Sequence, residues 1–417
     1  MSKPIRLLHT ADWHLGRTLC GRRRYAEFES FLDWLAETIE SEEVDGLLVA
    51  GDVFDTVAPS PRAQSLYYRF LSRVAAAPGC GQVVIIAGNH DSPALLNAPR
   101  EILQALNIQV AGQVNPGAAG EVLTLRDPGG RPQLIVAAVP YPRDRDLREA
   151  LAGESLEDKE RQLVEAISAH YQSAGRQAEE ALRRLPEPVP LVVMGHLFAA
   201  GGQTVEGDGS RALYVGSLGQ VPAEIFPACF DYVALGHLHQ PQVVGGRADR
   251  RYSGSPLPLT FAEAGRPKSV TLVDLGPGGV QVRLKEVPLF QPLERLAGDW
   301  EAIKSGLAAL AGQNAPAWLE IDYTGPKVIG DLRERVAGLT AGTGLEVLRI
   351  KSGRGLSQAL TSLAEGESLA ELDEAEVFRR CLAAHQVPVE QQPELRAAYE
   401  EILKSLHEGD AGEGAGR

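Results

Sequence analysis

The sequence predicts an α/β fold in which two β-sheets pack face to face between outer helices. Three observations support this class. The first third of the chain alternates short apolar runs with segments of helical period, in the order β-α-β-α-β-α. After residue 239, short strands separated by glycine- and proline-containing turns indicate a second, mostly antiparallel sheet. Five of the apolar runs end in a turn that carries Asp, Asn or His, which are metal-binding residue types.

The apolar periodicity places the elements along the chain. Residues 25–40 read as a helix because apolar side chains recur at 28, 31, 32, 35 and 39. Residues 93–106 are expected to form one helix, capped by Ser92 and beginning with Pro93. The other elements expected before residue 240 are strands over 5–10, 44–50, 82–87, 191–194 and 231–235, a helix over 59–74, an edge hairpin region over 108–139 and a charged helical stretch over 144–184.

Turn-forming residues and changes of pattern divide the chain into three parts. Residues 1–287 contain both predicted sheets, and the stretch from Pro288 to Pro292 reads as a linker. Residues 288–352 are expected to form a small α+β module, with strands over 318–323 and 346–350 and helices near 299–311 and 329–338. Residues 353–417 form an acidic tail with helical periodicity over 374–384 and 394–407.

The net charge of −14 argues against a protein that coats nucleic acid through bulk positive charge. The residues after 363 hold 13 acidic and 5 basic side chains, a net of −8, so the remainder is only mildly acidic. A local basic surface is therefore compatible with the composition. The chain lacks an apolar run of membrane-spanning length, a signal-peptide pattern and a Cys-x-x-Cys pair, so we expect a cytoplasmic protein with reduced thiols.

The five polar turns carry the residues that a metal site requires. Strand ends gather ligands at one edge of an open α/β sheet, so these side chains are expected to lie together. Mixed carboxylate, amide and imidazole groups suit Mn²⁺, Fe or Zn²⁺ better than an ion that prefers oxygen alone. Seven ligands suffice for two ions bridged by one carboxylate and one water, as in two-metal phosphate chemistry. The candidates are Asp12, His14, Asp52, Asn89, His90, His196, His237 and His239.

Each turn taken alone has a simpler explanation. A single His at a strand end is usually structural, and a single Gly-Asp is usually only a turn. Five of the nine histidines, however, lie in these turns. The ordered repetition favours a metal site over five coincidences. The histidines outside the turns, which we do not expect to act in catalysis, are His9, His170, His385 and His407.

The motifs Asp-x-His, Gly-Asp-x-x-Asp, Gly-Asn-His-Asp, Gly-His and Gly-His-x-His follow one another within residues 7–239. In this order they resemble the five signatures of the calcineurin-like metallophosphoesterases. The stretches LLHTADWHLGRTL, AGNHDSPALLN, YVALGHLHQPQ and YSGSPLPLTFAEAG further resemble the SbcD family of bacterial nuclease subunits. This resemblance covers nearly the whole chain. It implies an αββα metallophosphoesterase sandwich over 1–287, a capping domain over 288–352 and a partner-binding helical tail over 353–417.

The resemblance also implies a role for each candidate residue. Two Mn²⁺ ions would be bound per chain, with Mg²⁺, Fe or Zn²⁺ as alternatives. His90 would stabilise or protonate the leaving oxygen, and Asp91 would orient it. Asp52 would bridge the two ions, whereas Asp55 would only support its turn. The remaining ligands would be Asp12, His14 and His239 for one ion and Asn89, His196 and His237 for the other.

The implied activity is that of a Mn²⁺-dependent double-strand exonuclease and single-strand or hairpin endonuclease associated with the nucleoid. Its partners would be DNA ends, DNA hairpins and an SbcC-type coiled-coil ATPase. It would not bind a membrane. Basic residues just after the first turn are candidates for DNA phosphate contacts, although a charge run is usually only a solvated surface. These residues are Arg17, Arg22, Arg23 and Arg24.

The resemblance further implies a homodimer in which the helices after the Asp52 and Asn89 turns form a four-helix bundle. Ordinary core packing explains each apolar residue of these helices equally well. The residues concerned are Tyr67, Tyr68, Phe70, Leu71, Leu95 and Leu96.

Two other functions compete with the nuclease. A stand-alone phosphodiesterase or phosphatase of the same fold needs neither the C-terminal extension nor a partner. A catalytically silent scaffold would be expected to have lost ligands, and every expected ligand type is present.

Overall fold

The computed structural model describes residues 4–77, 79–127, 129–147, 155–199, 221–326 and 329–352, together with Phe378, Leu382 and Gln392. The chain divides into two compact units, Met1–Pro292 and Leu293–Arg417. The division falls at the end of the stretch that the sequence marks as a linker.

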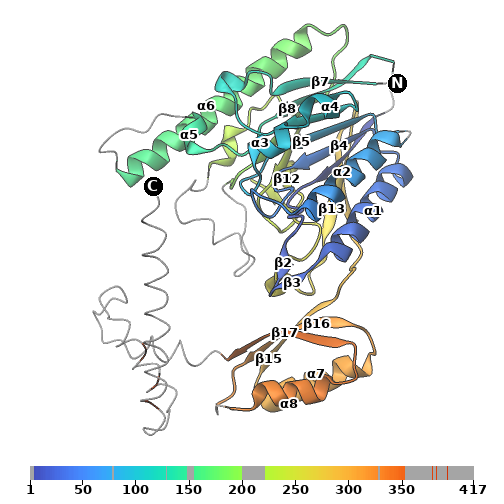
Figure 1. Ribbon diagram of the computed structural model, residues 1–417. Helices are drawn as coiled ribbons and strands as arrows, with labels where there is room; N and C mark the ends of the chain where they lie inside the picture. Colours follow the sequence, from blue (N-terminus) through green and yellow to red (C-terminus); the bar gives the residue numbers. More distant parts are fainter. Residues whose placement is uncertain are drawn as a thin grey trace, which may run out of the picture. The chain divides into compact units, whose positions relative to one another are not determined.

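Two six-stranded sheets form the centre of the first unit (Figure 1). The first sheet has the order β14-β13-β1-β4-β5-β6. Strands β1, β4, β5 and β6 are parallel, and the β13–β14 hairpin extends the sheet, with β13 antiparallel to β1 and β14 antiparallel to β13. The bounds of these strands are β1 (Ile5–Thr10), β4 (Gly46–Ala50), β5 (Gln82–Ile86), β6 (Ile108–Ala111), β13 (Ser269–Gly276) and β14 (Gly279–Glu286).

The second sheet has the order β11-β12-β10-β9-β8-β7. Strands β8, β9, β10 and β12 are parallel, so the expectation of a mostly antiparallel second sheet is wrong. The strands between residues 240 and 287 do not form a sheet of their own, because β11 and β12 join this sheet and β13 and β14 join the first. The bounds are β7 (Val122–Arg126), β8 (Pro132–Ala138), β9 (Leu191–His196), β10 (Tyr232–Gly236), β11 (Gln242–Val244) and β12 (Arg247–Tyr252).

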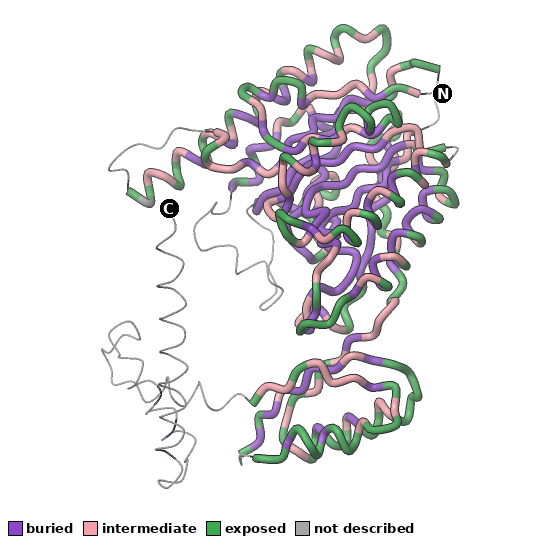
Figure 2. The backbone as a smooth tube through the Cα atoms, in the orientation of Figure 1, coloured by how far each residue is buried: buried purple, intermediate pink, exposed green. Residues whose placement is uncertain are grey.

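The central strands are buried on both faces, which explains their continuous apolar sequences (Figure 2). Leu7 and Leu48 face the core between the two sheets, together with Met194 of the second sheet. Their neighbours Leu8 and Leu47 face the core under the outer helices. Alternate residues of one strand thus serve two hydrophobic layers.

Helices α1 (Tyr25–Ser41) and α2 (Pro61–Ala76) cover the outer face of the first sheet, and α6 (Leu156–Arg183) covers the second (Figure 1). Ser60 caps α2 by accepting a hydrogen bond from the N–H of Ala63. The shorter elements of this unit are β2 (Thr18–Leu19), β3 (Arg22–Arg23), α3 (Pro93–Asn97), α4 (Arg100–Gln104), α5 (Asp144–Leu147) and the 3₁₀ turns Pro116–Ala118, Ala223–Ile225 and Phe261–Glu263.

Two sequence-based expectations in this unit need correction. The single helix expected over 93–106 is two short helices, α3 and α4, because Pro99 lacks the N–H group that would continue the first one. The edge hairpin expected over 108–139 is limited to β7 and β8, since β6 pairs with β5 in the other sheet.

Most residues considered for a dimer bundle lie in the core of the unit. Tyr68 and Leu95 are only partly buried, but both pack against the same core. For the fully buried residues the core-packing explanation is therefore correct, and they are not available to a second copy. These residues are Tyr67, Phe70, Leu71 and Leu96.

The second unit contains a three-stranded parallel sheet of order β15-β16-β17 and two helices (Figure 1). Parallel neighbours require crossover connections, which α7 and α8 supply. Strand β15 is not among the strands predicted from sequence, because its Leu-Glu-Arg-Leu-Ala-Gly lacks a clean alternation. The bounds are β15 (Leu293–Gly298), α7 (Trp300–Gly312), β16 (Ala317–Tyr323), α8 (Leu332–Thr340) and β17 (Leu345–Ser352).

The tail helices expected over 374–384 and 394–407 lie outside the described residues, apart from Phe378 and Leu382. Within the described part of the chain, every helix is too short or too polar to cross a membrane.

Candidate metal centre

The five polar turns follow β1, β4 and β5 of the first sheet and β9 and β10 of the second. Hydrogen bonds between the turns join the two sets of strand ends. Nδ1 of His196 donates to the carbonyl oxygen of Ala50 at 2.9 Å, and the N–H of His237 donates to Oδ1 of Asp12 at 2.9 Å. The two sheets thus meet at these turns, as the sequence predicts for the polar side chains.

Four of the candidate ligands have a left-handed backbone conformation. The φ angles are 54° for Asp12, 47° for His14, 51° for Asp52 and 105° for His237. Such a conformation costs a non-glycine residue on the order of 1–3 kcal/mol, and residues that adopt it cluster at functional sites. Backbone hydrogen bonds hold it here, because Asp12 donates to the carbonyl of Gly51 at 3.0 Å and His14 to that of Asp52 at 2.9 Å.

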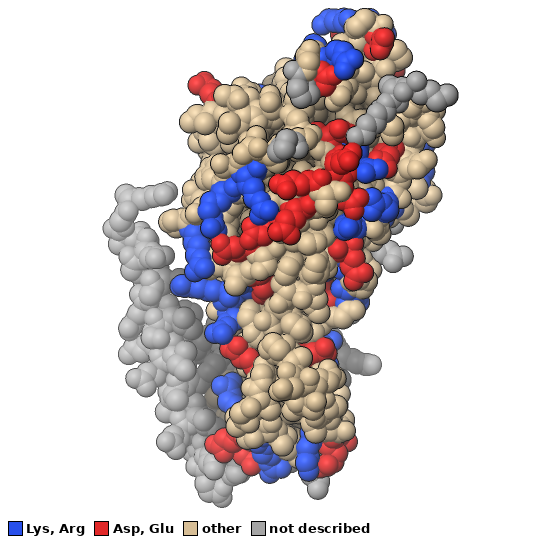
Figure 3. Space-filling model, turned by 90° about the vertical axis from the view of Figure 1, so that its right-hand side faces the viewer, with Lys and Arg blue, Asp and Glu red and all other residues tan. Residues whose placement is uncertain are grey.

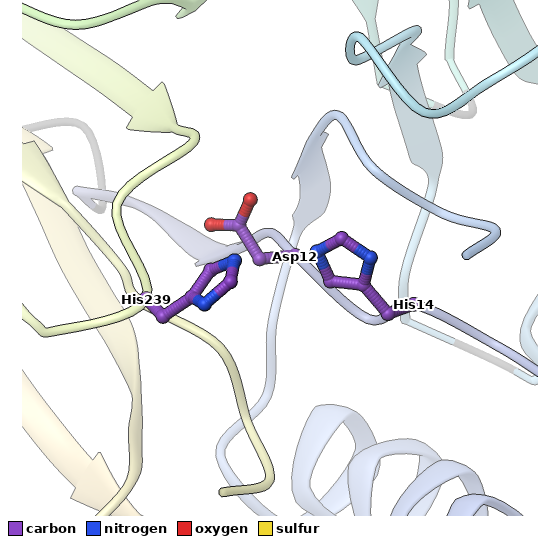
Figure 4. A group of neighbouring side chains, drawn as sticks. All are labelled: Asp12, His14 and His239. Carbon is purple, nitrogen blue, oxygen red and sulfur yellow. The ribbon is translucent and has the colours of Figure 1, made fainter. Parts of the chain in front are cut away.

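Asp12, His14 and His239 form the first group of candidate ligands, with donor atoms within 4.8 Å of one another. Figure 4 shows Asp12 between His14 and His239, which reach it from opposite sides. Nε2 of buried His14 has no hydrogen-bond partner among the described residues, and its Nδ1 has only a 3.3 Å contact with Oδ1 of Asp55. Leaving a buried polar group unpaired is costly, and a bound cation would satisfy it. The residues present therefore fit a metal ion.

Asp52 lies between this group and the rest of the centre. Its Oδ2 is 3.6 Å from Nε2 of His14 and 3.3 Å from Nε2 of His196. Its Oδ1 accepts a hydrogen bond of 2.9 Å from the N–H of His90. Donor atoms of Asp52, Asp12 and His196 also lie within 4.8 Å of one another. One carboxylate is thus within reach of both sides of the centre.

Asn89 brings the remaining candidates together. Its Oδ1 lies 3.0 Å from Nε2 of His196 and 3.1 Å from Nδ1 of His237. An amide oxygen that faces two imidazoles makes a three-sided pocket with nitrogen and oxygen donors. With this group, all seven residues that the sequence suggests as ligands are in one place.

Burial and neighbouring charges shift the pKa values in the centre. Burial raises the pKa of Asp12 to about 7 and lowers that of His237 to about 3. Burial alone would also raise the pKa of Asp52, but the imidazoles of His196 and His14 hold it well below its usual range. Burial opposes the charge on His196, yet the Asp52 carboxylate raises its pKa to about 9. The carboxylates and imidazoles are therefore strongly coupled.

His90 lies beside the candidate ligands, and a hydrogen bond from Nδ1 holds its ring. Its Nδ1 donates to the carbonyl oxygen of Asp55 at 2.8 Å. The expectation that Asp91 orients this ring is wrong, because its buried carboxylate accepts hydrogen bonds from the N–H groups of Val53 and Phe54 instead. Asp91 therefore ties the third turn to the second, and Asp55 holds His90.

Asp55 also supports His14. Its Oδ1 lies 3.3 Å from Nδ1 of His14 and accepts a hydrogen bond of 3.1 Å from Arg17. Asp55 therefore contacts a proposed ligand, and its place outside the ligand set stays a prediction.

The four arginines considered for DNA contacts differ in their accessibility. Arg22 and Arg23 form the exposed strand β3. Arg24 is buried, and its guanidinium donates to the carboxylate of Glu27 and to the carbonyl of Pro258. Arg24 is thus not available to DNA, and that expectation is corrected.

Acidic and basic side chains lie next to each other on the face shown in Figure 3. Ion pairs between α1 and α2 are of this kind, with Arg69 to Glu29 at 2.7 Å and Arg73 to Asp33 at 2.9 Å. Neighbouring charges of opposite sign cancel, so this face does not attract DNA through bulk charge.

Two basic residues near the centre are absent from the sequence-based candidates. Arg143 donates to the carbonyl of Asp91 at 2.9 Å and lines, with Asn89, an open groove of about 600 Å³. Lys268 donates to the carbonyl of His239 at 3.1 Å. These contacts join residues 52 and 29 positions apart, so no local sequence pattern marks them.

Comparison with known families shows two matching regions. Residues 5–241 match the model described as calcineurin-like phosphoesterase. Residues 289–386 match the model described as type 5 capsule protein repressor C-terminal domain.

Comparison with curated proteins shows similarity to D subunits of the SbcCD nuclease. The Escherichia coli (strain K12) subunit is 37% identical over 405 residues, which cover 96% of this chain and 98% of that protein. The Bacillus subtilis (strain 168) subunit is 37% identical over 327 residues, covering 76% and 78% of the two chains. The Rhodobacter capsulatus subunit is 38% identical over 298 residues, covering 70% and 71%.

Proposed function

The chain belongs to the SbcD family of calcineurin-like phosphoesterases, which are metal-dependent phosphodiesterases, and from this we propose a Mn²⁺-dependent nuclease subunit that works with an SbcC-type ATPase. Its substrates would be DNA ends, degraded as an exonuclease, and single strands or hairpins, cut as an endonuclease. Its biological setting would be DNA end processing in repair, recombination and replication.

The observation that carries the proposal is the meeting of five strand-end turns around one carboxylate. Asp52 lies within 3.6 Å of His14 on one side and 3.3 Å of His196 on the other. We assign it as the residue shared by two ions. One ion would then be held by Asp12, His14 and His239, and the other by Asn89, His196 and His237.

Two divalent cations bound there would lower the pKa of a water molecule and neutralise charge on the scissile phosphate. The chain's own residues supply the rest of the chemistry. His90 donates through Nδ1 to the carbonyl of Asp55, so in the doubly protonated ring the proton on Nε2 is the one that would pass to the leaving oxygen, leaving a neutral imidazole. Asp91 keeps the second and third turns together, so that His90 stays beside Asp52.

The remaining parts of the chain would bind the partners. Arg17, Arg22 and Arg23 are proposed to contact DNA phosphates, the module over 293–352 to cap the DNA path, and the acidic tail to bind the ATPase. We also propose a homodimer. Its contacts would come from exposed apolar side chains such as Ile102 and Leu106, which are 71% and 45% exposed.

A nuclease assay on the full chain tests the proposal. Blocked-end duplex and hairpin DNA would be incubated with Mn²⁺ or Mg²⁺, with and without the ATPase partner and ATP. We expect cleavage that needs the metal and is increased by the partner. His90→Asn is expected to keep metal binding and to lose about 10²- to 10⁴-fold in cleavage rate, the usual contribution of general acid catalysis.

His170→Asn is the matched control, because His170 pairs with Glu121 at 2.7 Å away from the ligand turns. Normal hairpin cleavage by His90→Asn would show that His90 has no role in proton transfer. Turnover of a small phosphodiester without any DNA cleavage would instead identify a stand-alone phosphodiesterase.

A further inference from the structure

Two donors converge on the carbonyl oxygen of His239. The backbone N–H of Ser255 and Nζ of Lys268 each lie 3.1 Å from this oxygen. The Ser255 hydroxyl lies 3.3 Å away, but its single proton has a shorter contact of 3.0 Å with the carbonyl of Leu257. A carbonyl oxygen has two lone pairs, so the N–H of Ser255 and the ammonium of Lys268 satisfy it and hold the backbone of His239.

Lys268 is buried, with only 7% of its surface exposed, and its ammonium group is fully paired. Besides the carbonyl of His239 it donates to Oγ of Ser255 at 2.8 Å and to the carboxylate of Glu263. An ammonium group has three protons, and these three partners use all of them. Burial of a charge is tolerated only when it is paired in this way.

Glu263 joins Lys268 to the loop that follows β12. Its Oε1 accepts a hydrogen bond of 3.2 Å from the N–H of Leu259. Within the same loop, a Cβ atom on Gly254 would lie 2.7 Å from the ring of Pro241 and 2.9 Å from the carbonyl of His239. The loop thus packs directly against the segment that carries His239.

A pocket adjoins this segment. It has a volume of about 510 Å³ and is lined by His239, Gln240, Pro241, Lys268 and Glu286, among others. Protein atoms do not fill this side of the segment, so its hydrogen bonds help to fix its position.

We propose that Lys268 is a positioning residue for His239 and that Glu263 holds Lys268 in place. The cation acts on the backbone of His239 rather than on a substrate. It keeps the imidazole aimed at Asp12 and His14 across the gap between the two sheets. This inference rests on the proposed role of His239 as a ligand of one of two ions. Its specific consequence is that loss of Lys268 weakens only the ion held by Asp12, His14 and His239.

The test compares Mn²⁺ binding by the full-length wild type, Lys268→Met and Lys285→Met. Lys285, on strand β14, is the matched control. It pairs with Glu42 at 3.0 Å and does not contact the centre. Binding would be followed by calorimetry, and the Mn²⁺ spectrum by electron paramagnetic resonance. Wild type and Lys285→Met are expected to bind two ions and to give the signal of a coupled pair.

Lys268→Met is expected to bind one ion normally and the other about 10- to 100-fold more weakly, as is typical when a residue supporting a metal ligand is removed. Its spectrum should change to that of isolated Mn²⁺. A purely structural role would not produce this selective loss. Unchanged binding of both ions, or equal weakening of both in a variant with native circular dichroism, would overturn the inference.

Glu263→Gln decides the question by the same criterion if Lys268→Met does not fold. Failure of the wild type itself to bind two ions would instead contradict the proposed two-metal function. The two ideas therefore fail in distinguishable ways.

Discussion

At the scale of single residues, the centre combines groups that hold protons with groups that do not. His196 has a pKa raised to about 9 by the Asp52 carboxylate against the effect of burial. Asp12 has a pKa raised by burial to about 7. Asp52, by contrast, is ionised between these two pKa values, and His237, with a pKa of about 3, is neutral there.

Metal binding at neutral pH should therefore release protons. At pH 7 the metal-free His196 is protonated and Asp12 is partly protonated, whereas a bound ion requires both to be deprotonated. We expect release of about one to two protons at pH 7 and an apparent affinity that rises until about pH 9. Calorimetry in two buffers of different ionisation enthalpy measures this number. A binding heat that is independent of the buffer at pH 7 would contradict it.

At the scale of elements, the strand ends at the centre lie so close together that a side chain would not fit at their closest approach. A Cβ atom on Gly236, the last residue of β10, would meet the carbonyl of Ala50 and lie 2.8 Å from Nδ1 of His196 and 2.9 Å from Cβ of Ala11. The glycine thus permits the contact of three turns at the point where the two sheets meet.

Gly236→Ala is accordingly expected to disturb the centre. Forcing an extra methyl group into a packed site typically costs about 1–3 kcal/mol, and here it would also separate the ligand turns. We expect a lower unfolding free energy and weaker Mn²⁺ binding, measured by urea denaturation and metal titration. Gly278→Ala is the control, because a Cβ atom there meets nothing within 4 Å. Equal metal binding by the two variants would refute the argument.

At the scale of the whole molecule, every residue assigned to the centre belongs to the first compact unit. The division between the units falls after Pro292, and His239 is the last proposed ligand along the chain. Each unit has its own hydrophobic core, with Ile303, Leu307 and Val336 at the centre of the second. The proposed catalytic groups and the proposed DNA contacts Arg17, Arg22 and Arg23 thus belong to the first unit, whereas the proposed capping module and ATPase-binding tail belong to the second.

A chain that ends at Pro292 should fold and retain the chemistry. We expect it to bind metal and to hydrolyse bis(4-nitrophenyl) phosphate as the full chain does, because all proposed ligands are present. Its cleavage of DNA with the ATPase partner should be strongly reduced. Parallel assays on the two substrates with both chains measure this. Loss of hydrolysis of the small diester in a folded truncated chain would show that the second unit contributes to the centre.

The sequence alone was sufficient for the fold class and for the five polar turns that meet between the two sheets. Buried parallel strands require continuous apolar runs, and a ligand turn must follow such a run directly, so both features are local in sequence. The restriction to local sequence also explains the expectations that were wrong. Nothing near β12 shows whether the next strands form a sheet of their own, and nothing near Arg24 shows that Glu27 and Pro258 enclose it.

Only the tertiary structure decided which groups hold the centre in place. Asp91 binds the backbone of another turn, Asp55 holds His90, and Lys268 reaches the carbonyl of His239 from the loop before β13. These are contacts between segments that meet through folding, and a single sequence carries no periodic signal for them. The chain by itself therefore determined what the site can bind, and the packing of two sheets determined how those residues are aimed.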